Sequence, residues 1–308
     1  MSRPTLRAAG LVVGSALAAA LAVAAEPARI LELFANTPAR SVAAAFFVHT
    51  AILATRAFRL RLLAAGKLPY PQAFLLFATT QTASALLPWR LGELALPPVA
   101  RWALRARLSH GAFWWLGGRF FDLWSLSLVV AAGALGGVFP SFFLPPALGL
   151  FAASSAAAFW ATHRRLWHAL SSLLPSRRLI RGVLGMRRVL AAFGQEKMAV
   201  ASCFGLSVGS WALIVGFTDL LCQAMDPALS LRQVAAAVLG ATLGAALPIS
   251  GVGNLGPLEA GFASALSLSG VAATKALAVG FALHLWTLVF QIAVGLPAAL
   301  LLAWNRPR

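Results

Sequence analysis

LPISGVGNLGPLE, residues 247–259, interrupts an apolar segment that is long enough to cross a membrane. Pro lacks an amide hydrogen and ends a helix, while Gly adopts backbone conformations that a helix does not use. The segment 231–269 is therefore predicted to form two helices joined at a break. Its return leg, 257–269, would reach only about 20 Å as a helix, whereas the hydrocarbon core is about 30 Å thick. We expect a re-entrant hairpin.

A second break has the same character. LLPWRLGE, residues 86–93, interrupts the apolar segment 70–104, and the return leg 92–104 is again too short for a full crossing. The sequence therefore predicts two re-entrant helical hairpins.

The composition around these hairpins is that of a membrane protein. Of the 308 residues, 60% are hydrophobic and 11% are charged, with mean hydropathy +0.83, whereas soluble domains have about 25% charged residues. We predict an all-α polytopic membrane protein with six transmembrane helices besides the two hairpins. The spans are 8–25, 41–58, 110–138, 142–161, 198–222 and 273–303.

The distribution of charge supports this topology. A net charge of +17 suggests nucleic acid binding in a soluble protein, but most of the 25 Lys and Arg residues fall here on one side of the predicted membrane. That side is predicted to be cytoplasmic and includes Arg56, Arg59 and the basic loop 162–197. The basic residues on the other side are Arg29, Arg40, Arg232 and Lys275. We expect both termini in the cytoplasm.

The pattern span, span, hairpin, span occurs twice, with the hairpins entering from opposite sides. We interpret residues 1–308 as one transmembrane domain, an inverted repeat with halves of about 1–139 and 140–308. Such folds place the substrate near the midplane, between the repeats. The loop 162–197 is predicted to be an interfacial helix on anionic lipid, with a solvated linker as the alternative.

Five charged residues are expected inside the membrane, where each needs a reason because insertion costs about 3 kcal/mol. Arg90 and Glu93 lie at the first break, and Glu259 begins the return leg of the second hairpin. Arg119 and Asp122 share a helical face at i, i+3 spacing. The alternatives are a helix-locking ion pair for Arg119 and Asp122, and capping of broken ends for Arg90 and Glu93.

Arginine favours a phosphate-bearing ligand, because its planar fork of donors suits phosphate and keeps its charge. We predict that Arg90 and Arg119 bind an anionic head group. Glu93, Asp122 and Glu259 would balance the empty site or carry protons. His284, which follows Glu259 by 25 residues as Arg119 follows Glu93 by 26, is a candidate for the same relay or an ordinary core histidine.

The second break completes the predicted substrate-binding set with Gly251, Gly253, Asn254 and Gly256. These glycines allow a ligand to approach the backbone, and the amide end of the helix that begins at Pro257 favours an anion. Close helix packing is the alternative.

Other chemistry has little support. Cys203 and Cys222 lack metal-ligand spacing and are expected to be free buried thiols. No GxxxxGK[ST] segment occurs, so we expect no ATP site. No His-rich or Asp-rich cluster is visible either, and we expect no metal and no other cofactor. The first segment has a passable signal-peptidase site at 22–24, but its apolar stretch favours a retained span.

The motifs resemble those of the lysylphosphatidylglycerol synthetase transmembrane, or flippase-like, domain family. Residues 86–93 are like its LLPxRxGE, residues 119–122 like its ERxxD and residues 247–259 like its LPxxxGGxGxxE, in the same order. Two departures are Gly118, where the family usually has Glu, and 94–96, which lacks the common Arg step.

The resemblance implies translocation of lipids with charged or glycosylated head groups in a bacterial inner membrane. No aminoacyl-transferase domain follows before Arg308, so synthesis of aminoacyl lipid is not expected. We predict a lipid flippase or transporter whose partners are membrane lipids and not nucleic acid, with a homo-oligomer left open. The alternatives are an intramembrane transferase or hydrolase acting on a lipid phosphate, and a non-transporting assembly partner.

Overall fold

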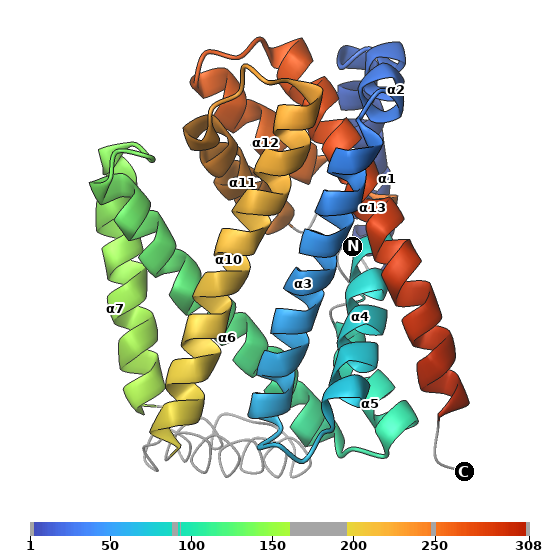
Figure 1. The fold of residues 1–308 in the computed structure, drawn as a ribbon, viewed down its shortest axis with the longest axis vertical. Helices are drawn as coiled ribbons and strands as arrows, with labels where there is room; N and C mark the ends of the chain where they lie inside the picture. The colour runs from blue at the N-terminus through green and yellow to red at the C-terminus, as the bar shows by residue number, and fades with distance from the viewer. Residues whose placement is uncertain (1–2, 88–91, 93, 161–195, 248–250, 306–308) are drawn as a thin grey trace. The chain divides into compact units, whose positions relative to one another are not determined.

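The structure, a computed structural model, describes residues 3–87, 92, 94–160, 196–247 and 251–305. In these residues it has helices and no strand, so the all-α prediction is confirmed (Figure 1). The helices are α1 (Arg3–Ala24), α2 (Pro27–Ala35), α3 (Ala39–Leu63), α4 (Tyr70–Leu86), α5 (Leu96–Leu104), α6 (Leu108–Leu135), α7 (Leu144–Trp160), α10 (Lys197–Met225), α11 (Leu231–Ala245), α12 (Pro257–Leu268) and α13 (Ala273–Trp304), with short 3-10 turns η2 (Ser141–Phe143) and η3 (Val252–Asn254).

Four helices are long and apolar enough to cross a membrane: α3, α6, α10 and α13. They coincide with four of the predicted spans. Helices α1 and α7 lie at the other two, although the apolar stretches described in them are shorter. The six-span arrangement itself stays a prediction.

Both predicted interruptions are confirmed as breaks between helices. Helix α4 ends at Leu86 and α5 begins at Leu96, while α11 ends at Ala245 and α12 begins at Pro257. Pro257 occupies the first turn of α12, where its missing amide hydrogen costs nothing.

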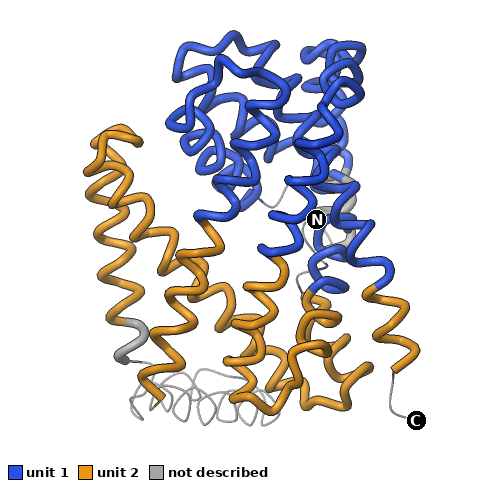
Figure 2. Tube along the Cα trace, in the orientation of Figure 1, with its two compact units in different colours: residues 1–52, 78–93, 212–297 blue, residues 53–77, 94–211, 298–308 orange. Residues whose placement is uncertain are grey.

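The chain forms two compact units (Figure 2). Unit 1 contains residues 1–52, 78–93 and 212–297, and unit 2 contains 53–77, 94–211 and 298–308. Each unit takes segments from both halves of the predicted repeat. Four of the five boundaries fall inside α3, α4, α10 and α13, and the fifth lies between α4 and α5.

The second hairpin, formed by α11 and α12 in unit 1, is packed closely through glycines. A Cβ on Gly244 would lie 2.0 Å from the Pro257 carbonyl oxygen, and one on Gly261 would lie 2.1 Å from that of Gly240. These pairings run in opposite directions along the chain, so α11 and α12 form an antiparallel pair with their backbones in contact. Helices in membranes associate in this way, because small residues let backbones approach.

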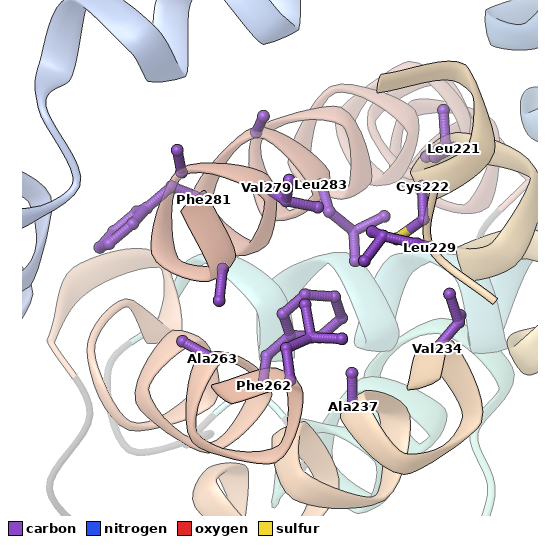
Figure 3. Close-up of a cluster of buried hydrophobic side chains, with 14 of the residues drawn as sticks. Leu221, Cys222, Leu229, Val234, Ala237, Phe262, Ala263, Val279, Phe281 and Leu283 are labelled. Carbon is purple, nitrogen blue, oxygen red and sulfur yellow. The ribbon is translucent and has the colours of Figure 1, made fainter. Parts of the chain in front are cut away.

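The apolar core of unit 1 lies beside this hairpin. Figure 3 shows Phe262 of α12 facing Val279 and Leu283 of α13, with Leu221 and Cys222 of α10 in the same cluster. Cys203 and Cys222 are both free and buried, as predicted.

In the other unit, α6 packs against α5 and α7. Gly111 of α6 approaches Pro97 of α5 so closely that a Cβ would lie 2.6 Å from its Cα. Trp124 of α6 donates its indole N–H to Ser155 Oγ of α7 at 3.0 Å. This packing fixes α6, which carries Arg119 and Asp122.

We predict that Gly261→Val destabilises the protein by about 1–3 kcal/mol, because no space exists for the added side chain. Thermal unfolding of the purified protein in detergent measures the loss. The matched control is Gly216→Val in α10, where nothing lies within 4 Å of an added Cβ. Equal melting temperatures of the two variants would show that close contact does not stabilise the hairpin.

Candidate functional site

A buried ion pair joins α3 to α6 in unit 2. Arg59 Nη1 lies 2.5 Å from Asp122 Oδ1 and also donates to Ser207 Oγ of α10 at 2.5 Å. Both Arg59 and Asp122 are buried. Removing one partner of such a pair leaves an uncompensated charge and typically costs 3–5 kcal/mol.

Two further arginines surround the same carboxylate. Arg119 Nη1 lies 3.8 Å from Asp122 Oδ2, and Arg56 Nη2 lies 4.0 Å from Oδ1. The predicted i, i+3 pair of Arg119 and Asp122 therefore forms, but both distances are too long for hydrogen bonds. Three guanidinium groups thus face one carboxylate, and only Arg59 donates to it at close range.

Arg56 and Arg59 are the residues that the sequence reasoning missed. Both were predicted to be cytoplasmic charges, Arg56 in the last residues of the predicted span 41–58 and Arg59 just beyond it. Helix α3 continues to Leu63, and the side chain of Arg59 is buried against α6 and α10. The available signal was their i, i+3 spacing, which places both on one face of that helix.

The backbone around Asp122 is also tied down. Its carbonyl oxygen accepts hydrogen bonds from Trp211 Nε1 and Ser125 Oγ, each at 3.1 Å. A Cβ on Gly118, one turn earlier, would lie 3.5 Å from Arg59 Nη2. Gly118, the residue that departs from the family motif, therefore lies beside the buried side chain of Arg59.

Unit 1 holds the second buried carboxylate, Glu259. Its Oε2 accepts the backbone N–H of Gly256 at 2.7 Å, and its Oε1 makes a short hydrogen bond with Nδ1 of His284. Glu259 is fully buried and His284 is 6% exposed. The carboxylate thus ties the start of α12 to α13, and the spacing of 25 residues noted in the sequence corresponds to a direct contact.

The second break contacts the last turn of α4 inside unit 1. Asn254 Nδ2 donates to the Ser84 carbonyl oxygen at 2.6 Å, in the last turn of α4 where intrahelical donors run out. On the far side of the first break, Gly92 lies against α4, because a Cβ there would be 2.0 Å from the Ala83 carbonyl carbon. Asn254 therefore satisfies a broken helix end.

The glycines of the second break meet protein at close range. A Cβ on Gly251 would lie 3.2 Å from Ser15 of α1, and one on Gly256 would lie 3.1 Å from the Gly14 carbonyl oxygen. Gly253 and Gly256 also have positive φ angles of 69° and 111°, which favour glycine. Their assignment as ligand contacts stays a prediction.

The predicted site residues therefore separate into two sets. Arg119 and Asp122 lie together in unit 2, whereas Asn254, Gly256, Glu259 and His284 lie together in unit 1. Arg90, Glu93 and nearly all of the loop 162–197 lie outside the described residues. Across the part that is described, no group of three His, Cys, Asp or Glu residues is placed to hold a metal ion.

Comparison with known proteins identifies the family. The family described as "Lysylphosphatidylglycerol synthase TM region" matches residues 7–295 of the chain. The chain belongs to this family. This member of the lysylphosphatidylglycerol synthase TM region family is a multi-pass membrane protein, as its apolar helices also indicate. Searches of curated proteins and of solved structures gave no match.

We predict that Glu259 and His284 are energetically coupled. Glu259→Gln keeps an acceptor for the Gly256 amide but changes the contact with His284, and His284→Ala removes that contact. A double-mutant cycle on unfolding stability should give a coupling of about 1–3 kcal/mol, as for residues in one hydrogen-bond network. Pairing His284→Ala with Glu32→Gln, an exposed carboxylate on α2, should be additive within about 0.5 kcal/mol. Additivity of the first pair would show that the contact does not stabilise the second break.

Proposed function

We propose that this protein is a lipid flippase or transporter that moves a lipid with an anionic or charged head group between membrane leaflets. The observation that carries the proposal is the buried ion pair of Arg59 and Asp122, on helices apolar enough to span a membrane. Membership of the lysylphosphatidylglycerol synthase TM region family supports a lipid-related function.

The cost of buried charge supports a functional role. Each charged residue at the centre of a span costs about 2.5–3.5 kcal/mol on insertion scales, and a buried ion pair is a poor way to gain stability. A group of three arginines and one aspartate exceeds what locking α3 to α6 requires. Binding of a phosphate-bearing ligand would account for the extra arginines, because arginine donors match phosphate oxygens.

The proposal includes a topology and a form of coupling. Six spans and two re-entrant hairpins would place both termini in the cytoplasm of a bacterial inner-membrane protein. Arg90 and Arg119 would contact the head group. Glu93, Asp122, Glu259 and His284 would balance charge or carry protons, since no ATP-binding motif occurs in the sequence.

Reconstitution into liposomes tests the function. Protein in vesicles with a fluorescent anionic phospholipid should accelerate leaflet exchange, measured by dithionite quenching. Arg119→Ala should slow exchange about tenfold or more, since a hydrogen bond to a charged group contributes about 1.5–3 kcal/mol. The matched control is Arg101→Ala, an exposed arginine on α5, which should leave the rate unchanged.

The same vesicles distinguish the alternatives. Mass spectrometry of the lipid detects chemical conversion, which would favour an intramembrane transferase or hydrolase if it occurs without redistribution. If lipid exchange occurs at the rate of protein-free vesicles and no lipid is converted, the remaining alternative is a non-transporting assembly partner. Exchange that is equal in the wild type and in Arg119→Ala would remove this residue from the site.

A further inference from the structure

The group formed by Arg56, Arg59, Arg119 and Asp122, here called the arginine cluster, carries excess positive charge. Three guanidinium groups lie within 4.0 Å of one carboxylate. The chain has only eight Asp and Glu residues. Of these, Glu259 binds Gly256 and His284, and Asp226 pairs with Lys275 at 2.7 Å. Three guanidinium groups around one carboxylate leave a net positive charge, and one further carboxylate, such as Glu93 outside the described residues, would not cancel it.

We propose that the arginine cluster binds a phosphate group and that Asp122 is the resident counter-ion of that site. The inference deepens the proposed function and rests on it for the source of the phosphate, a lipid head group. It adds Arg56 and Arg59 to the predicted head-group site, beside Arg119.

The cluster has an inner and an outer part. The side chain of Arg59 is 4% exposed and holds Asp122 in place, while that of Arg119 is 38% exposed. Arg119 and Arg56 approach Asp122 at 3.8 and 4.0 Å, so they contribute charge to the carboxylate without hydrogen bonds. An anion that reaches Arg119 would meet an attractive field that Asp122 alone does not neutralise.

Competition between Asp122 and the ligand predicts that removing Asp122 strengthens phosphate binding, which a structural ion pair does not predict. A carboxylate and a phosphate both accept from arginine, so removal of the carboxylate should strengthen phosphate binding. A purely structural ion pair predicts a different result. In that case Asp122→Asn destabilises the protein equally with and without phosphate, because nothing replaces the lost charge.

Gly118 supplies the converse variant. Because a Cβ at this position would lie 3.5 Å from Arg59 Nη2, in ordinary van der Waals contact, Gly118→Glu can be accommodated and brings a second carboxylate to the cluster. This variant should compete with phosphate, whereas Gly118→Gln adds the same bulk without charge and serves as its matched control.

The experiment measures thermal unfolding of the full chain in detergent. The probes are inorganic phosphate, dioctanoyl phosphatidylglycerol and, as a lipid without phosphate, dioctanoylglycerol, with chloride at matched ionic strength as the baseline. Saturating phosphate probe should raise the melting temperature of the wild type by roughly 2–4 °C, and that of Asp122→Asn by at least twice as much. Arg119→Gln should lose the shift, and Gly118→Glu should reduce it.

Controls separate site binding from general salt effects. Asp226→Asn removes a carboxylate from an ion pair with a single lysine and should show the wild-type shift with phosphate. Gly118→Gln should also keep the shift. If Asp122→Asn does not fold, the wild type compared with Arg119→Gln still decides, because Arg119 is partly exposed and leaves the pair of Arg59 and Asp122 intact.

Each outcome has one meaning. A shift with dioctanoyl phosphatidylglycerol alone supports a lipid head-group site, and a shift with inorganic phosphate supports a phosphate site open to solutes. Melting temperatures that no phosphate probe changes would overturn the inference, even if the liposomes show lipid exchange. A phosphate shift in a protein that exchanges no lipid would keep the site and refute the transport function.

Discussion

Backbone groups at a broken helix need partners from the protein itself, because hydrocarbon offers none. The second break satisfies this constraint with two side chains. Glu259 accepts the N–H of Gly256, and Asn254 donates to the carbonyl of Ser84 in the other broken segment. The loop that carries Asn254 closes on itself, since the Gly251 N–H donates to the Leu255 carbonyl oxygen at 3.0 Å. These contacts make an interrupted helix compatible with a membrane protein.

A second constraint, the desolvation of charge, governs unit 2. Arg59 and Asp122 are buried, and Arg59 donates to both the Asp122 carboxylate and the Ser207 hydroxyl. Neutral packing of similar volume would stabilise α3 against α6 at least as well, because burying two charges is costly. This cost supports the proposal that the two further arginines around the same carboxylate serve ligand binding.

The sequence predicts those features that depend on local chemistry. Pro and Gly gather at both breaks and disfavour a continuous helix there, so the breaks after Leu86 and Ala245 follow from local residue types. Contacts between segments that are distant in the sequence cannot be predicted from residue types alone. Asn254 and Ser84 are 170 positions apart, and Arg59 and Asp122 are 63 apart. By the Lys/Arg bias of cytoplasmic loops, an arginine near the end of a span is counted as a loop charge. The bias contains no information about a carboxylate on another helix.

The residues predicted as one site differ in what their contacts do. Asn254, Gly256 and Glu259 have their polar groups engaged with one another's helices, and the glycines beside them meet α1 at close range. Their chemistry is that of a scaffold which keeps two broken helices in register. Arg119 is different, because its partly exposed guanidinium lies 3.8 Å from a carboxylate that Arg59 already binds. Within the described residues, these contacts support our proposal that the arginine cluster binds the anion, while the side chains of the second break connect helix ends.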